Sequence, residues 1–235
     1  MELGAVRAIC FDLDNTLWEI EPVLLRAEGI LADWLRDRYP RIPQAVSALE
    51  MAALRAALQR EQPHQAHDLS HLRRETLKRA ALTAGYDPET AGNIAHAAFE
   101  AWHVARNQVT TYDETLPALA RLKPRFRLAT LSNGNADLRR IGMAHHFEVS
   151  LSAGPLGFAK PDPRAYVALA DALTLAPSEI LFVGDEPHAD VVGPRAAGMY
   201  TAWVNRQGRT WPEELPAADL AIAHLGELAA LFEET

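Results

Sequence analysis

The chain has 235 residues, of which 49% are hydrophobic and 23% charged, and its formal net charge is −8 at pH 7. This composition is typical of a globular protein and excludes a disordered chain, while the acidic balance argues against partners that need a basic face, such as nucleic acid or an acidic membrane. A single cysteine, Cys10, excludes an intrachain disulfide, and no apolar stretch approaches the length of a membrane span, so we expect a soluble cytoplasmic protein.

Short apolar runs predict five buried strands, at residues 6–11, 127–131, 148–151, 180–183 and 200–204. Segments with a helical spacing of apolar residues accompany them, at residues 114–123, 135–143, 163–173 and 187–197. Strands that alternate with helices of this length predict an α/β fold, with a parallel sheet covered by helices on both faces. In such a sheet, ligands bind beyond the carboxyl ends of the strands.

The alternation is interrupted from about residue 20 to residue 108, where no segment has a convincing strand pattern. Pro22 can open a helix with one apolar face, and Asp87 followed by Pro88 predicts the start of another. Two further helices are predicted at residues 45–58 and 68–84, which gives an insert of four helices. We therefore expect a core of residues 1–18 and 109–235, with a helical domain of residues 19–108 inserted into it.

Two aspartates, Asp12 and Asp14, follow the first predicted strand. On an extended segment, side chains two residues apart point the same way, and two carboxylates this close need a nearby cation. We expect Asp12 to be a nucleophile and metal ligand, and Asp14 to be a general acid for the leaving oxygen and then a base for water. The structural alternative is a polar turn, in which aspartate is common. Trp18, just past these residues, is expected to pack at the hinge of the insert rather than line a pocket.

Ser132 and Asn133 follow the second predicted strand, and Lys160 directly precedes a stiff turn that contains Pro161 and Pro163. A hydroxyl together with backbone N–H groups at the start of a helix can hold phosphate oxygens. Lys160 can neutralise both Asp12 and the phosphate. Each residue also has an ordinary explanation, since serine and asparagine cap helices and an isolated lysine is usually a solvated surface charge.

The fourth predicted strand is followed by Asp185 and Glu186, with Asp190 close behind. Mg²⁺ prefers oxygen ligands in an octahedron and usually keeps several waters. We expect Asp185 to bind Mg²⁺ directly, while Glu186 and Asp190 contribute directly, through water or from behind the direct ligands. The alternative is a helix start enriched in acids that match the helix dipole. Because the four polar groups follow predicted strands in order, they favour a single phosphoryl-transfer site.

These segments, in this order, resemble the haloacid dehalogenase superfamily of hydrolases, whose four motifs match residues 12–17, Ser132, Lys160 and residues 184–190. The resemblance implies a doubly wound, Rossmann-like sheet in strand order 3-2-1-4-5, which would bring Asp12 and Asp185 together. It implies that the backbone carbonyl of Asp14 is a further Mg²⁺ ligand, and that the insert is a cap that closes over the substrate. An acid at position 14 favours phosphate esters, because dehalogenating relatives have no leaving alcohol to protonate.

Residues 11–18, 21–28, 132–136 and 153–161 resemble a bacterial group of enzymes that act on flavin mononucleotide and on the phosphorylated ribitylamino-uracil of riboflavin synthesis. Glu186 and Pro187 depart from the small polar residues common in the family, and Pro194 interrupts the expected helix. The sequence predicts a Mg²⁺-dependent phosphomonoester hydrolase of a small phosphorylated metabolite, acting through a phospho-aspartyl intermediate, as a monomer or homodimer. The alternatives are a phosphosugar mutase and a non-catalytic binding protein of the same fold.

Overall fold

The computed structural model describes residues 3–233, which form two compact units. A sheet-containing unit holds the described residues of Met1–Glu19, Thr110–Gly134 and Ile141–Thr235, and a helical unit holds Ile20–Val109 together with Asn135–Arg140. The division predicted from the sequence did not include a contribution of residues 135–140 to the helical part. None of the described helices is both long and apolar enough to cross a membrane.

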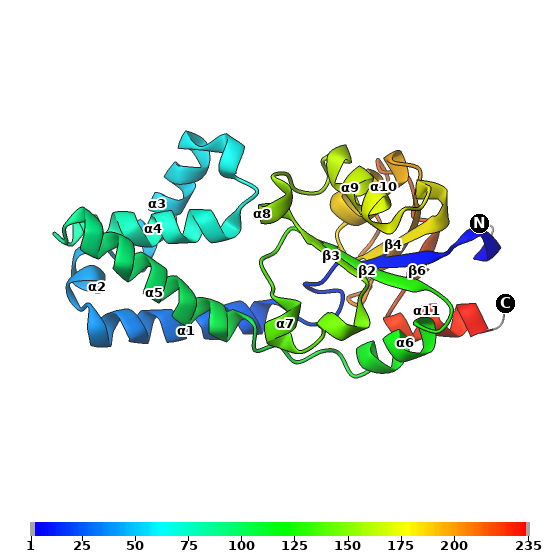
Figure 1. Cartoon of the computed structure of the whole chain (residues 1–235), viewed down its shortest axis with the longest axis horizontal. Coiled ribbons are helices and arrows are strands. Elements are labelled where there is room, and N and C mark those ends of the chain that lie inside the picture. Colours follow the sequence, from blue (N-terminus) through cyan, green and yellow to red (C-terminus); the bar gives the residue numbers. More distant parts are fainter. Residues whose placement is uncertain (1–2, 234–235) are drawn as a thin grey trace. The chain divides into compact units, whose positions relative to one another are not determined.

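The described residues contain a parallel sheet of six strands in the order β3-β2-β1-β4-β5-β6 (Figure 1). The strands are β1 (Ala8–Phe11), β2 (Arg127–Ser132), β3 (Val149–Ser152), β4 (Ile180–Gly184), β5 (Tyr200–Val204) and β6 (Leu220–Ile222). The α/β class and the order 3-2-1-4-5 of the first five strands are confirmed. Strand β6 was not predicted, because three residues are too few to display a strand pattern.

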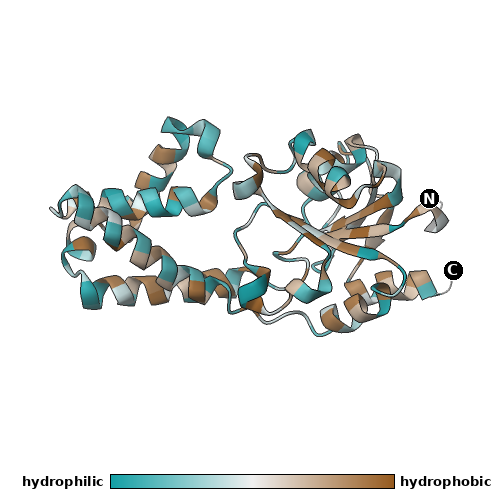
Figure 2. Ribbon diagram, viewed as in Figure 1, coloured by the Kyte–Doolittle hydropathy of each residue, from teal (hydrophilic) through white to brown (hydrophobic). Residues whose placement is uncertain are grey.

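Helices cover both faces of the sheet (Figure 1). On one face, Ala8 and Cys10 of β1 pack in one cluster with the buried side of α9 (Pro163–Leu173). On the other face lie α6 (Thr115–Leu122) and α11 (Leu225–Glu233), and the ring of Phe232 meets that of Phe126 at a centroid distance of 4.6 Å. Every residue of β1 and β4 is buried, which explains their continuous apolar runs, drawn brown in Figure 2.

The remaining segments of the sheet-containing unit and its boundary are short. They are α7 (Leu138–Ile141), α8 (Ala153–Leu156), a π-helix (Pro187–Val192), α10 (Gly193–Ala196) and three 3-10 turns (Leu3–Ala5, Ala144–His146 and Pro177–Glu179). The helix predicted at residues 135–143 is therefore only one turn long. The helix predicted at residues 187–197 begins as a π-helix and continues as α10, with Pro194 in the first turn of α10, where its missing N–H costs no hydrogen bond.

The helical unit contains five α-helices within the described residues, not four. They are α1 (Glu21–Arg38), α2 (Arg41–Ala45), α3 (Ala48–Glu61), α4 (Leu69–Thr83) and α5 (Pro88–Arg106), with a 3-10 turn at Pro63–Gln65. The additional helix, α2, occupies the proline-containing stretch between α1 and α3. Side chains cap three helix starts: Ser47 forms a capping box with Glu50, and Asp68 and Asp87 accept hydrogen bonds from backbone N–H groups.

Candidate active site

Three polar residues lie side by side at the carboxyl edge of the sheet. Phe11, the last residue of β1, pairs with Thr130 of β2 and Val183 of β4. The following residues, Asp12, Ser132 and Asp185, therefore come out at the same edge. The backbone N–H of Asp12 donates to the carbonyl of Val183 at 2.8 Å, which extends the pairing and fixes the backbone of Asp12.

Lys160 joins two of the carboxylates in the interior of this edge. Its Nζ donates to Oδ1 of Asp12 at 2.8 Å and to Oδ1 of Asp190 at 2.7 Å. All three side chains are buried, with 4% of Lys160, 8% of Asp12 and 1% of Asp190 exposed. Burial alone would lower the pKa of Lys160, but the attraction of Asp12 and Asp190 outweighs it and raises that pKa. Lys160 is therefore a fixed positive charge, not a solvated surface lysine.

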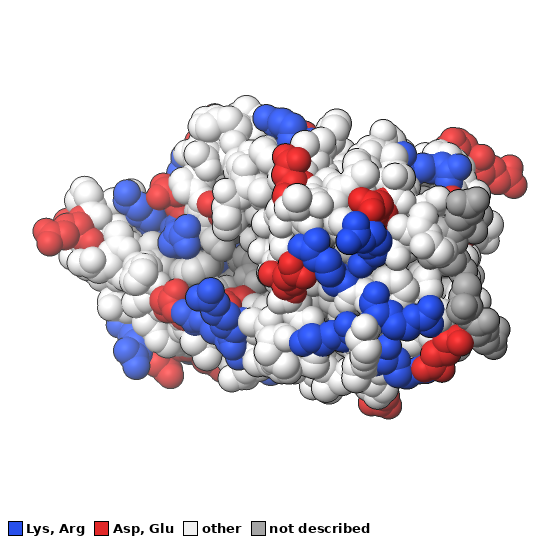
Figure 3. Space-filling model, turned by 45° about the vertical axis from the view of Figure 1, so that its right-hand side comes forward, with Lys and Arg blue, Asp and Glu red and all other residues white. Residues whose placement is uncertain are grey.

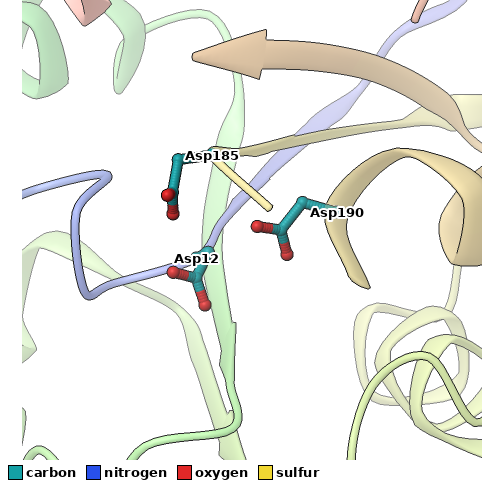
Figure 4. A group of neighbouring side chains, drawn as sticks. All are labelled: Asp12, Asp185 and Asp190. Atoms are coloured by element: carbon teal, nitrogen blue, oxygen red, sulfur yellow. The ribbon is translucent and has the colours of Figure 1, made fainter. Parts of the chain in front are cut away.

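Asp12, Asp185 and Asp190 form a cluster in which carboxylate oxygens, one from each, lie within 4.8 Å of one another (Figure 4). Burial raises the pKa of Asp12 to about 8; Asp190 adds to this rise, and Lys160 opposes it. Burial and then repulsion from Asp190 raise the pKa of Asp185 to about 6. Lys160 bonds two of these three carboxylates, and the carboxylates outnumber the cations near them. Closely spaced carboxylate oxygens with too few neighbouring cations are a donor set that fits Mg²⁺.

Gly184 allows Asp190 to reach this cluster. A Cβ atom on Gly184 would lie 2.3 Å from both Cγ and Oδ2 of Asp190, so any other residue would displace that side chain. Oδ2 of Asp190 accepts a hydrogen bond from the backbone N–H of Glu186 at 2.9 Å. With one oxygen on Lys160 and the other on this N–H, Asp190 holds the lysine in place behind Asp12.

Glu186 and Asn133 are engaged with the backbone. The Glu186 carboxylate accepts from the backbone N–H of Ala189 at 2.6 Å and so caps its own π-helix, and Glu186 is absent from the carboxylate cluster found in the described residues. The Asn133 side chain donates to the carbonyl of Lys160 and accepts from its backbone N–H, both at 2.8 Å. This pair of bonds indicates that the Asn133 amide positions the Lys160 loop, in which the Lys160–Pro161 peptide is cis.

Ser132 is the last residue of β2 and is buried, with its Oγ accepting a hydrogen bond from the backbone N–H of Gly134 at 3.0 Å. The strand therefore delivers the hydroxyl to the same edge as Asp12. The bond to Gly134 holds the start of the following loop against Ser132.

Asp14 lies in a tight turn that the chain makes after β1. Asn15 in this turn has a φ of 62°, and the backbone N–H of Asn15 donates to the carbonyl of Trp18 at 2.7 Å. Asp14 and Trp18 form a parallel β-bridge. The indole Nε1 of Trp18 donates to Oδ1 of Asp14 at 2.8 Å, and Trp18 is fully buried. Trp18 thus holds one oxygen of the carboxylate predicted to be the general acid.

Two residues that hold Asp185 could not be recognised in the sequence. The backbone carbonyl of Asp185 accepts from Nε1 of Trp203, on β5, at 3.0 Å and from Nη2 of Arg209 at 2.6 Å. The same Arg209 nitrogen is 3.6 Å from the Asp185 carboxylate, and it opposes the rise in the pKa of that carboxyl. Neither residue belongs to a motif, and only the pairing of β5 beside β4 brings them to Asp185.

Comparison with known proteins assigns this chain to one family of hydrolases. Residues 6–198 match the family model described as haloacid dehalogenase-like hydrolase. The chain is 32% identical over 234 residues to the 5-amino-6-(5-phospho-D-ribitylamino)uracil phosphatase YigB of Escherichia coli strain K12, covering 98% of each chain. It is also 40% identical over 163 residues to a phosphoserine phosphatase of Thermus thermophilus, covering 66% of this chain and 63% of the relative.

A solved structure is similar over the same extent. The crystal structure of a 2-haloacid dehalogenase from Pseudomonas syringae pv. tomato DC3000 superposes with a TM-score of 0.92 at 36% identity, and the match covers 97% of this chain and 99% of that chain. Similar proteins with two kinds of described chemistry, phosphate ester hydrolysis and dehalogenation, thus share the fold. The residues at the site must decide between them.

Proposed function

Because the chain belongs to the haloacid dehalogenase-like hydrolase family, we propose that it is a phosphomonoester hydrolase that depends on Mg²⁺ and forms a phospho-aspartyl intermediate on Asp12. The observation that carries this proposal is the buried Asp12 carboxylate 2.8 Å from Lys160, in a cluster with Asp185 and Asp190. A nucleophilic carboxylate must be ionised, and Lys160 favours that form of Asp12.

The proposed reaction has two steps. In the first, a carboxylate oxygen of Asp12 forms a bond to phosphorus while the bond to the leaving oxygen breaks, and Asp14 gives that oxygen its proton. In the second, Asp14 takes a proton from water, whose oxygen attacks phosphorus and releases phosphate from Asp12. Ser132 and Lys160 would bind the equatorial oxygens.

The donor set supports Mg²⁺ as the cofactor. Asp12, Asp185 and the backbone carbonyl of Asp14 would hold the ion, with Asp190 retaining Lys160 behind them. When bound, Mg²⁺ neutralises the phosphate charge that develops during transfer. The chain's own residues bind and orient the phosphate, and they carry the proton at the Asp14 carboxylate.

Asp14 also favours phosphate esters over haloacids, although a dehalogenase is among the similar structures. A leaving alcohol needs a proton and a leaving halide does not, so a placed general acid has a use only in the first reaction. The hydrogen bond from Trp18 to Asp14 supports that use, because it orients the carboxylate. Release of halide from 2-chloropropionate without phosphatase activity would reverse this choice.

We propose a small phosphorylated metabolite as the substrate. The similarity to YigB supports 5-amino-6-(5-phospho-D-ribitylamino)uracil as the first candidate, and flavin mononucleotide is the other candidate that we propose. The cytoplasm is the proposed compartment, consistent with a single, buried and free cysteine.

The test is phosphate release from a panel of esters with and without Mg²⁺. Asp12→Asn should lower turnover by at least about 10⁴-fold, because it removes the nucleophile, while circular dichroism shows an unchanged fold. Asp14→Asn should slow turnover and leave ³²P bound to the protein after mixing with labelled substrate. Retained turnover in Asp12→Asn would refute the mechanism, and transfer of phosphate to a second hydroxyl of a sugar phosphate would identify a mutase.

A further inference from the structure

A cavity of about 550 Å³ opens at the amino edge of the sheet, at the opposite end of the strands from Asp12. It is lined by residues that precede β1, by the turn between α6 and β2, and by the segment that leads into β3. Arg7 and Asp12 lie at the two ends of β1, five residues apart, which corresponds to about 16 Å along an extended chain. The cavity is therefore distinct from the catalytic site.

The walls of the cavity are strongly basic in a protein of net charge −8. Its lining contains four permanent cations (Arg7, Lys123, Arg125 and Arg127) and one carboxylate (Glu148). Figure 3 shows a group of Lys and Arg side chains on the surface of the sheet-containing unit. The cavity thus has a local charge opposite to that of the chain as a whole, which attracts anions.

The cations of the lining divide into two pairs. Arg127 forms two hydrogen bonds with Glu148, and Arg7 is 3.2 Å from Glu179, so these two are neutralised. Within residues 3–233, neither Lys123 nor Arg125 forms an ion pair with a carboxylate. Both are exposed, and the Lys123 ammonium donates to a backbone carbonyl, that of His145, at 2.7 Å. Two cations two residues apart are therefore available to one anionic group.

The positive field of this region also acts on a neighbouring histidine. The rings of His145 and His146 lie in the lining with their centroids 4.0 Å apart. Burial lowers the pKa of His146, and the nearby His145 and Lys123 lower it further. The lowered pKa favours the neutral form of the His146 imidazole. The two rings offer flat, partly apolar surfaces beside the cations.

We propose that this cavity binds a small phosphorylated molecule with a flat organic body, with its phosphate between Lys123 and Arg125. A dianionic phosphate matches two unpaired cations better than a single carboxylate does, and arginine binds phosphate oxygens with a planar fork. The volume of the cavity suits a drug-sized ligand and is larger than a phosphate group alone would fill. The histidine rings and the apolar side chains of Phe126 and Phe147, all in the lining, suit the remainder of a nucleotide-like molecule.

The experiment is calorimetric titration of the full chain with adenosine 5′-monophosphate in EDTA, which suppresses turnover, with chromatography to verify that the nucleotide stays intact. Lys123→Gln/Arg125→Gln should weaken binding by at least about tenfold, because both charge-assisted hydrogen bonds to the phosphate are lost. Both side chains are exposed, so the fold should persist. Arg139→Gln/Arg140→Gln, a basic pair outside the lining, should leave the affinity unchanged.

Three comparisons make the proposal refutable. Ser132→Ala should not change the affinity, so a loss confined to that variant would place the nucleotide at the catalytic edge and overturn the proposal. Adenosine should bind at least about tenfold more weakly than its monophosphate, and equal binding would refute recognition of the phosphate. Ribose 5-phosphate should also bind more weakly, and equal binding would refute the contribution of the rings. Absence of nucleotide binding to the wild-type chain would refute the site altogether.

Discussion

Each unit contains a group of charged side chains built around a buried cation, Lys160 or Arg73, and the two groups differ in charge balance. In the sheet-containing unit, Lys160 is shared by Asp12 and Asp190, with Asp185 within reach of both. In the helical unit, Arg73 of α4 pairs with a single carboxylate, Glu28 of α1, at 2.6 Å.

The helical group is also closed by an aromatic ring. The Arg73 guanidinium lies 3.7 Å from the centre of the Trp102 ring, and Nε1 of Trp102 donates to the same Glu28 oxygen at 3.2 Å. Glu28, Arg73 and Trp102 together join α1, α4 and α5. The charges of Glu28 and Arg73 cancel. A matched pair of this kind stabilises a structure, whereas an excess of carboxylates is stable only with an added cation. The difference distinguishes a structural ion pair from a site.

Gly184→Ala should cause the largest loss, because the added Cβ would collide with Asp190 and separate it from Lys160. We expect the free energy of unfolding to fall by about 1–3 kcal/mol and phosphatase activity to fall with it. The matched control is Gly92→Ala in α5, where nothing lies within 4 Å of the new Cβ and helix propensity should raise stability. Wild-type activity in Gly184→Ala would show that the position of Asp190 is unimportant for the site.

The excess of carboxylates predicts a pH dependence for the metal-free protein. The folded-state pKa of Asp12 is about 8 and that of Asp185 about 6, both above the ordinary aspartate value of 3.8. Between the unfolded and folded values, the native state holds protons that the unfolded state has lost. Its stability therefore falls as the pH rises through this window. In EDTA, we expect the melting temperature to drop by at least about 3 °C from about pH 5.5 to about pH 7.5.

Asp185→Asn serves as the control for this measurement, because it removes one of the two groups and leaves the other titrations in place. The decline should be shallower in the variant, and Mg²⁺ should raise the melting temperature of the wild type more at the higher pH. An equal decline in both proteins would contradict an excess of negative charge centred on Asp185.

Trp18→Phe tests whether general acid catalysis by Asp14 depends on the hydrogen bond from Trp18. The variant keeps an aromatic ring in the buried turn and removes the donor to Asp14. We expect kcat to fall by about tenfold or more with KM nearly unchanged, and the limb of the pH–rate profile that reports the general acid to move. Trp211→Phe, whose indole bonds the carbonyl of Leu215 instead, should have little effect on either quantity. A wild-type pH profile in Trp18→Phe would limit Trp18 to a packing role.

The sequence predicted the parts of the site that follow strands and could not predict the parts brought in by distant loops. Asp12, Ser132 and Asp185 were found because parallel strands deliver their last residues to one edge. Arg209 was not, because a surface arginine in an irregular loop has no periodicity or spacing that points to Asp185. Asn133 had the expected location, but its side-chain partner depends on the path of the Lys160 loop, which spacing does not encode.

The fold likewise contains some elements that the local sequence predicts and others that depend on distant contacts. The buried strands β1 and β4 have continuous apolar runs that predict them, whereas the three-residue β6 depends on its pairing with β5. The helix expected at residues 187–197 has a π-helical start, and this start places Asp190 against Gly184 and Lys160. Helical spacing predicts that a helix is present but does not distinguish a π turn from an α turn.

Glu28→Gln gives the smallest expected effect and tests the matched pair directly. The amide keeps an oxygen for Arg73 and Trp102 but leaves the guanidinium of Arg73, whose side chain is 10% exposed, without a counter-charge. Because 45% of the Glu28 side chain is exposed, solvent screens part of the loss, and we expect about 1 kcal/mol less stability in urea unfolding. Glu61→Gln breaks an Arg79 pair of the same 2.6 Å length in the same unit, but both of its side chains are more exposed, so its cost should be smaller. Equal costs would mean that the burial of Arg73 does not strengthen its pair, and the contrast with the carboxylate-rich edge would then have to rest on metal binding alone.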